Sequence, residues 1–196
     1  MIYPIIAYGD PVLRKVAAEI TPDYEGLDQL IEDMHETMRN SNGIGLAAPQ
    51  IGKSIRLFVV DSKSILDNIR DEKDNEFRDE EGIEMTFINA RLLGKSGKKW
   101  EYNEGCLSIP KIREDISREE EISLEFYDAQ WKKHTRKFKG LTGRVVMHEF
   151  DHIEGKLFID YVSPLKKRLI KSRLENISKG MISVDYKMKF PQKKLF

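Results

Sequence analysis

The chain has 196 residues, of which 40% are hydrophobic, and this length and composition suit a single domain with its own core. Its 33 basic and 33 acidic side chains give a formal net charge of zero, and we expect neither DNA nor a membrane as a partner. No apolar run of about 18 residues is present, and the N-terminus lacks the basic and apolar regions of a signal peptide. We therefore expect a cytoplasmic protein.

Apolar spacing and capping residues predict the helices and strands in chain order. Asp10 followed by Pro11 predicts a short helix ending near residue 19, and helical apolar spacing predicts another over residues 24–39. Runs of β-forming residues predict strands over residues 55–60, 85–93, 122–127 and 135–139. Glycines bracket a predicted helix over residues 141–153, and Ser163 and Gly180 mark the ends of a last helix.

These elements predict the α+β class. We expect one domain over residues 1–196, with mostly antiparallel sheets packed around the buried central helix 141–153 and with a C-terminal helix.

Charge is unevenly distributed along the chain. Residues 61–84 hold ten acidic and four basic side chains between two predicted strands, which predicts a charged surface-loop insertion. Residues 164–196 hold ten basic and two acidic side chains, and we interpret residues 181–196 as a basic tail.

The most informative stretch is His148-Glu149-Phe150-Asp151-His152, an H-E-x-x-H motif. Residues four apart lie on one face of a helix, so the two imidazoles can bind one metal ion. Glu149 would then reach a water molecule beside the metal. A catalytic metal needs a third protein ligand and keeps one position open. The motif is short enough to arise by chance, so the third ligand is the deciding question.

Cys106 is the strongest candidate for the third ligand. It is the only cysteine, so no intramolecular disulfide can form, and one thiolate with two imidazoles is a known catalytic ligand set. The alternatives are a buried structural thiol, or a carboxylate ligand downstream. We expect the two remaining histidines, His35 and His134, at the surface. The carboxylates that remain open as third ligands are those of Asp160, Glu175 and Asp185.

A third segment, residues 42–50, is a glycine-rich turn that lacks the ending of a phosphate-binding loop. Its small residues would let a substrate backbone approach closely, and Gln50 offers an amide donor. Taken alone, the segment is more typical of a plain tight turn.

Together the three segments resemble the signature motifs of the peptide deformylase family, in the same order. They are Gly43-Ile44-Gly45-Leu46-Ala47-Ala48-Pro49-Gln50, Glu104-Gly105-Cys106-Leu107-Ser108 and His148-Glu149-Phe150-Asp151-His152. The likeness extends to residues 8–14 and 155–160. Two departures stand out. Met147 replaces the glutamine that commonly precedes the first histidine, and residues 61–84 form the charged insertion.

The resemblance implies a metal-dependent hydrolase that takes part in protein biosynthesis by removing the N-formyl group from initiator methionine, with release of formate. Cys106, His148 and His152 would bind one divalent metal ion, which is Fe(II) in the cell, with Zn, Ni or Co as substitutes. The metal would activate a water molecule, and Glu149 would transfer its proton to the departing amine. Gln50 and the Leu107 N–H would donate hydrogen bonds to the oxyanion.

The resemblance also implies how the N-formyl-methionyl peptide binds. An extended peptide would pair with backbone near Gly43, Ile44 and Gly45 on one side and Gly105 on the other. The methionine side chain would enter an apolar pocket, for which we name Ile44, Leu141 and Val145. Arg144 lies beside them, and its stem would line the mouth of the pocket or face solvent.

Two functional alternatives stay open on the sequence. One is a metallopeptidase completed by a downstream carboxylate, and the other is a non-catalytic metal-binding or peptide-binding protein. A structural metal site needs no general base, so Glu149 argues against the second. We expect a monomer, because the predicted site uses residues of one chain. The basic C-terminal region is a candidate for a transient contact with ribosomal RNA.

Overall fold

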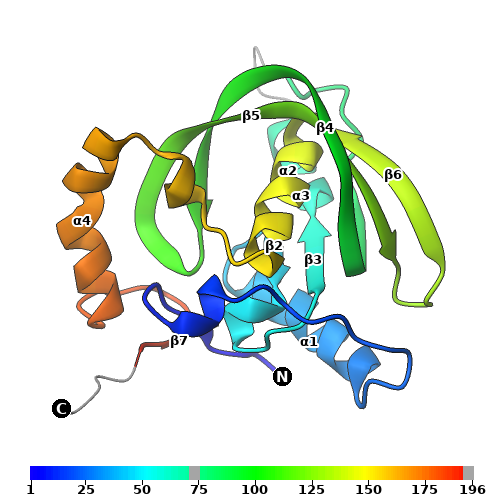
Figure 1. The fold of residues 1–196 in the computed structure, drawn as a ribbon, viewed down its shortest axis with the longest axis horizontal. Coiled ribbons are helices and arrows are strands. Elements are labelled where there is room, and N and C mark those ends of the chain that lie inside the picture. Colours follow the sequence, from blue (N-terminus) through cyan, green and yellow to red (C-terminus); the bar gives the residue numbers. More distant parts are fainter. Residues whose placement is uncertain (71–75, 192–196) are drawn as a thin grey trace.

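A computed structural model describes residues 1–70 and 76–191 (Figure 1). Its main sheet has five antiparallel strands in the order β2-β3-β4-β5-β6, and β1 pairs with β7 in a separate two-stranded parallel sheet. The prediction of an α+β fold with mostly antiparallel sheet is therefore confirmed. The strands of the main sheet are β2 (Gly45–Ala47), β3 (Leu57–Asp61), β4 (Glu84–Cys106), β5 (Ile109–Tyr127) and β6 (Lys133–Lys139).

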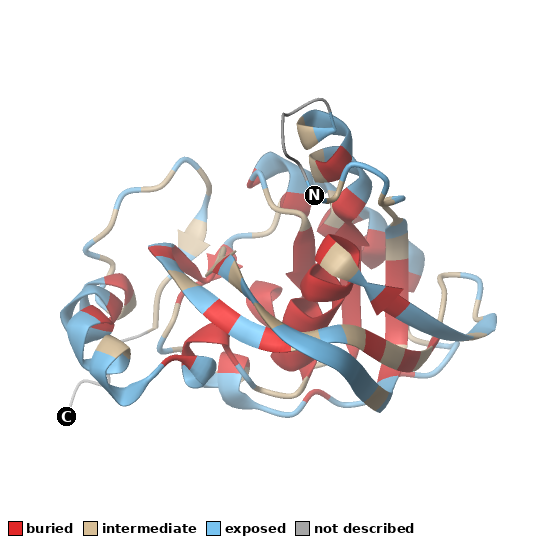
Figure 2. Ribbon diagram, turned by 90° about the horizontal axis from the view of Figure 1, so that it is seen from above, coloured by how far each residue is buried: buried red, intermediate tan, exposed pale blue. Residues whose placement is uncertain are grey.

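Strand β3 lies between two helices. Its side chains alternate in direction, so Phe58 and Val60 pack in the core with α3 (Gly140–Ile153), while Leu57 and Val59 pack in the core with α1 (Leu27–Asn40). A strand buried on both faces is continuously apolar, and this explains the run Leu-Phe-Val-Val. Helix α3 is buried along nearly its whole length (Figure 2).

Strands β4 and β5 form one long hairpin, which the sequence pattern indicated only in part. Residues 84–88 of β4 pair with β3, and residues 121–127 of β5 pair with β6. Beyond those stretches the two strands pair only with each other. β4 ends and β5 begins at the Leu107-Ser108 turn. Charged and polar residues on the exposed face of this arm hid its strand periodicity, and as a result residues 94–106 and 109–121 were not predicted as strands.

The first predicted helix is much shorter than expected. A single 3-10 turn, η1 (Pro11–Arg14), begins at Asp10, whose side chain accepts a hydrogen bond from the Val12 N–H. The chain is extended from Lys15 onward. Ala17 donates its N–H to the Ile153 carbonyl, and Ala18 donates its N–H to the Ser54 carbonyl, just before β3. These tertiary bonds replace the helical ones.

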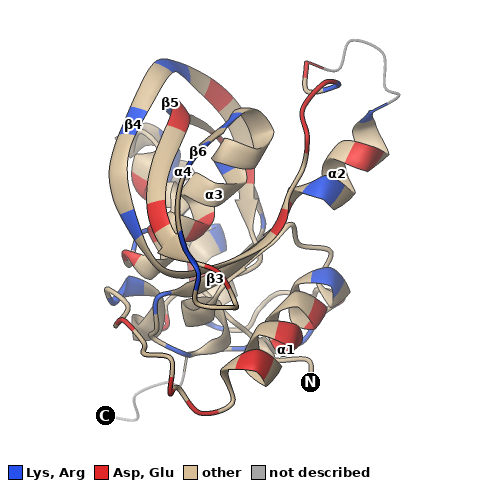
Figure 3. Ribbon diagram, turned by 90° about the vertical axis from the view of Figure 1, so that its right-hand side faces the viewer, with Lys and Arg blue, Asp and Glu red and all other residues tan. Residues whose placement is uncertain are grey.

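The acidic insertion is not a plain loop. Helix α2 (Ser62–Ile69) occupies its first part, with the Asp61 side chain accepting from the Ser64 N–H and with Leu66 buried. Residues 71–75 lie outside the described residues. Figure 3 shows acidic residues along the segment that returns toward β4. There Glu80 accepts hydrogen bonds from the N–H groups of Leu141 (2.9 Å) and Thr142 (2.6 Å), where a carboxylate stabilises the N-terminus of α3.

The C-terminal part contains the predicted last helix. Ser163 caps α4 (Pro164–Ser178), its side chain accepting from the Lys166 N–H, and Gly180 follows with a positive φ of 73°. The chain then returns as β7 (Met188–Lys189), which pairs with β1 (Ile5–Ile6). The predicted basic tail thus includes an ordered strand, and residues 192–196 lie outside the described residues. Among the helices described, none has the length and apolar character needed to cross a membrane.

Candidate metal centre and substrate cleft

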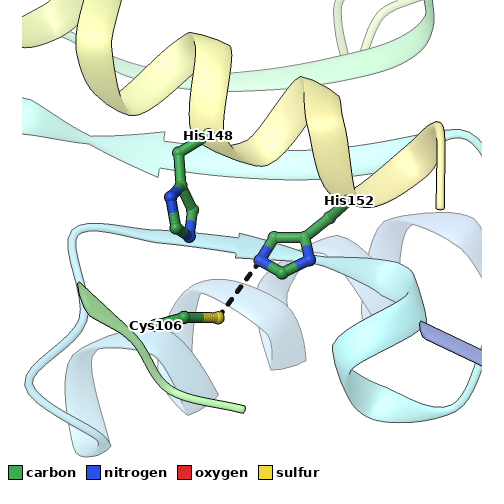
Figure 4. A group of neighbouring side chains, drawn as sticks. All are labelled: Cys106, His148 and His152. Carbon is green, nitrogen blue, oxygen red and sulfur yellow. Dashed lines mark hydrogen bonds between the residues drawn. The ribbon is translucent and has the colours of Figure 1, made fainter. Parts of the chain in front are cut away.

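Cys106, His148 and His152 come together beneath α3 (Figure 4). The histidines project from the same face of α3, one turn apart, and Cys106 approaches from the end of β4. The Cys106 Sγ lies 3.2 Å from the His152 Nε2, and the three ligand atoms lie within 4.8 Å of one another. Within the described ranges, this is the only cluster of three or more potential metal ligands of these residue types.

This ligand set fits a divalent transition metal. Metal–sulfur and metal–nitrogen bonds of about 2.3 and about 2.0 Å place neighbouring ligand atoms of a tetrahedral site roughly 3.5 Å apart. The 3.2 Å between sulfur and nitrogen is close to that spacing. One thiolate and two imidazoles also leave a fourth position for water or substrate, as catalytic sites require.

A buried network of charges orients His148. The Nδ1 of His148 lies 3.0 Å from the Glu104 Oε2, so Nδ1 donates there and Nε2 is left for a metal. Arg118 donates to both carboxylate oxygens of Glu104 and, at 2.5 Å, to Asp151. Burial alone would raise the pKa of Glu104, but hydrogen bonds from His148 and Arg118 outweigh it and hold that pKa far below its usual value. Glu104 is therefore ionised at neutral pH.

Glu149 is buried beside the cluster without a strong partner of its own. Its Oε2 makes no hydrogen bond, and burial raises the pKa of its carboxyl group to about 7. An unpaired buried carboxylate is costly, so its presence indicates a role in chemistry instead of folding. A divalent cation at the neighbouring cluster would favour the charged, proton-accepting form.

Gly45 provides the space that Glu149 occupies. A Cβ atom on Gly45 would lie 2.4 Å from the Glu149 Oε1 and 2.7 Å from its Cδ. Gly45 was predicted from the sequence to bind peptide, and the structure adds this close approach to the carboxylate.

Replacing Gly45 with Ala is expected to lower turnover by ~10²-fold with metal content unchanged, because the new methyl group must displace the Glu149 carboxylate. Steady-state kinetics with metal analysis measures both quantities. Gly94→Ala is the matched control, since a Cβ atom at that position would have no neighbouring atom within 4 Å. Wild-type turnover in Gly45→Ala would show that this carboxylate position is not needed.

The two predicted oxyanion donors, Gln50 and Leu107, both lie next to Cys106. The Gln50 side chain is fixed by the Ala47 N–H, which donates to its Oε1 at 2.8 Å. Its Nε2 then points toward the Cys106 Sγ and the Ser108 hydroxyl, each 3.4 Å away. Leu107 begins the turn between β4 and β5. Both residues line the same cavity as Cys106, His148 and Glu149.

The cavity has a volume of about 580 Å³ and lies between β2, the end of the β4–β5 hairpin and α3. Most residues predicted to bind substrate line it, namely Gly43, Ile44, Gly45, Gly105, Arg144 and Val145. Leu141 is the exception. It is completely buried at the start of α3 and is not among the lining residues, so its place in the pocket stays a prediction.

Arg144 does not face solvent, which was one of its two predicted positions. It is 2% exposed, donates to Glu104 at 3.1 Å and to the carbonyls of Trp100 and Ile116, and stacks 4.3 Å over the Trp100 ring. Because part of the residue also lines the cavity, Arg144 connects the pocket with the Glu104 network. The partners of a buried arginine come from distant strands, so sequence spacing could not predict this role.

Other functional candidates were missed from the sequence. In the sequence, Glu104 is only a motif position, Asp151 is only the variable residue between Glu149 and His152, and nothing marks Arg118. The charged residues around Arg118 conceal it in the sequence, and only the structure shows that it is buried and paired with Glu104 and Asp151. His35 and His134 lie away from the cluster, beside Thr86 and Asp128.

The fold and the site define a small α+β protein with a Cys-His-His cluster that could hold a metal ion beside a cleft. Residues 2–168 match the family model described as polypeptide deformylase. A peptide deformylase of Christiangramia forsetii is 50% identical over 196 residues, which cover 99% of this chain and 98% of the relative. One of Flavobacterium psychrophilum is 50% identical over 194 residues, covering 99% and 100%.

Solved structures of peptide deformylases are also similar to this chain. A peptide deformylase from Legionella pneumophila is 32% identical, with a TM-score of 0.76 over 92% of this chain and 98% of that one. One from Plasmodium falciparum is 34% identical, with a TM-score of 0.76 over 90% and 95%. The chain belongs to the polypeptide deformylase family.

Proposed function

We propose that this chain hydrolyses the N-formyl group of formyl-methionine at the start of nascent polypeptides, releasing formate. The observation that carries the proposal is the Cys106-His148-His152 cluster with Glu149 buried beside it in the wall of a peptide-sized cleft. Membership of the deformylase family supports the same reaction.

The residues of the chain would divide the chemistry among them. Cys106, His148 and His152 would hold the metal, which when bound lowers the pKa of water and polarises the formyl oxygen. Glu149 would accept a proton from the attacking water and pass it to the departing amine. The Gln50 amide and the Leu107 N–H would donate to the oxygen that becomes negative, and one such donor is worth ~3 kcal/mol. Fe(II) is our proposed cellular metal, with Zn, Ni or Co as substitutes.

Substrate would bind as an added strand. β2 lies at the edge of the main sheet, and its first residue, Gly45, borders the cavity together with the preceding Ile44. An extended peptide could pair there on one side and with Gly105 on the other, leaving the methionine side chain to enter the apolar part near Ile44 and Val145.

Mass spectrometry of formyl-Met-Ala-Ser and of a longer unformylated peptide tests which bond is cut. The proposal is supported if formyl-Met-Ala-Ser loses its formyl group while the unformylated peptide stays intact. Internal cleavage of the second would favour the metallopeptidase alternative. That alternative also needs a downstream carboxylate, but Asp160 is held by Arg14 at 2.6 Å, and neither Glu175 nor Asp185 belongs to the cluster.

We also propose a transient ribosome contact through α4. Its exposed side chains include Lys167, Arg168 and Lys171. If these residues neutralise RNA phosphates, binding should weaken as salt rises. Co-sedimentation with ribosomes at increasing salt measures this, with an Arg168→Glu, Lys171→Glu variant beside the wild type. Absent or salt-insensitive binding would contradict the proposed contact.

A further inference from the structure

The C-terminal segment returns to the active site after the matched family region has ended. The family model stops at residue 168, and α4 then leads to residues 181–190. Ser183, Val184, Asp185 and Tyr186 from this segment line the same cavity as Cys106 and Glu149. The wall of the substrate cleft therefore includes residues that the motifs of the chain do not predict.

Tyr186 makes the one directed contact from this segment to the catalytic turn. Its hydroxyl donates to the Leu107 carbonyl at 2.8 Å. Its ring packs, together with Leu107, against the core cluster that contains Met34 and Leu46. The hydroxyl and the turn therefore meet at a half-buried position where a hydrogen bond has little competition from water.

The small parallel sheet fixes the position of Tyr186. Ile5 donates its N–H to the Lys187 carbonyl at 2.8 Å, and Ala7 donates to the Lys189 carbonyl at 2.9 Å. Tyr8, two residues after the end of β1, donates its N–H to the Ser108 carbonyl at 2.9 Å. The two carbonyls of the Leu107-Ser108 turn are thus both held by residues that flank the β1–β7 sheet in the chain.

Fixing these carbonyls constrains the amide that the reaction uses. The Leu107 carbonyl and the Leu107 N–H are separated only by the φ and ψ rotations at one Cα. Holding the peptide plane that follows Leu107 therefore restricts the direction of the Leu107 N–H. An oxyanion donor contributes fully only when it is already aimed at the developing charge.

We propose that Tyr186 is a positioning residue for deformylation, which acts by holding the Leu107 turn so that the Leu107 N–H is aimed at the reacting oxygen. The inference rests on the proposed function, since it assigns Tyr186 a role through Leu107. It makes the C-terminal segment a part of the active site.

Tyr186→Phe removes only the hydroxyl and tests this role. Loss of one neutral hydrogen bond should lower kcat by roughly three- to tenfold, with KM nearly unchanged, because the bond acts on the transition state and not on peptide binding. Kinetics with formyl-Met-Ala-Ser on fully metal-loaded protein measures the two constants separately. Tyr24→Phe is the matched control, because Tyr24 packs against the same core cluster and does not line the cavity.

The outcomes are distinct. A lowered kcat in Tyr186→Phe, with metal content, Tm and KM as in the wild type, supports the inference. A kcat equal to that of the wild type overturns it while the proposed function stands. A loss that comes only with lower metal content or lower Tm shows a structural role and also overturns it. If the wild type releases no formate, both the function and the inference fail.

Discussion

Replacing Glu149 with Gln should abolish nearly all turnover while the protein still binds its metal. Glutamine has the same shape but cannot accept a proton, so the expected loss is about 10²- to 10⁴-fold in kcat. The three ligand atoms belong to Cys106, His148 and His152, and none of them is altered. Metal content per chain and formate release from formyl-Met-Ala-Ser measure the two effects separately.

A second glutamate provides the control for that experiment. Glu154 follows the last turn of the same helix and pairs with Arg56 at 2.6 Å, away from the cluster. Glu154→Gln should therefore keep wild-type turnover. If Glu149→Gln also keeps it, another group is the general base, and the mechanism proposed for this site is wrong.

Replacing Cys106 with Ala is expected to remove both the metal and the activity. The change deletes one of three ligands and leaves two imidazoles at i and i+4, which cannot hold a catalytic ion tightly by themselves. Metal analysis after gel filtration would show far less than one equivalent, with turnover falling in proportion. Circular dichroism checks that the fold is retained.

Asp160→Asn separates the deformylase site from a carboxylate-completed one. Asp160 accepts hydrogen bonds from Arg14 and from the Leu157 N–H, so its loss should leave metal content unchanged. The opposite pattern, with metal kept in Cys106→Ala and lost in Asp160→Asn, would establish a carboxylate ligand and contradict the ligand set described above.

The candidate metal ligands were largely predictable, because the histidine spacing is local and the chain has a single cysteine. His148 and His152 lie one turn apart on any helix, and a lone cysteine beside glycine is a natural third ligand. The structure brings these residues together as expected. Helix α4 was predictable for the same reason, since the Ser163 cap and Gly180 are local signals.

Features that depend on distant partners were not predictable. The segment after Arg14 is extended because Ile153 and Ser54 accept its N–H groups, and no local signal records those bonds. Arg144 was ambiguous because it lies on α3 and its partner Glu104 lies on the distant strand β4. Helix α2, by contrast, does carry a local signal, because Asp61 caps its N-terminus. The high charge of residues 61–84 nevertheless favoured the prediction of a loop.

The central claim is that this site removes formyl groups, and the most direct test is formate release. Protein purified anaerobically with Fe(II), with Ni- and Zn-loaded samples beside it, would be given formyl-Met-Ala-Ser after its metal content is confirmed. We expect formate to be released by the Fe(II) and Ni samples, and a large excess over Zn would identify the working metal. No formate from any fully loaded sample would contradict the account.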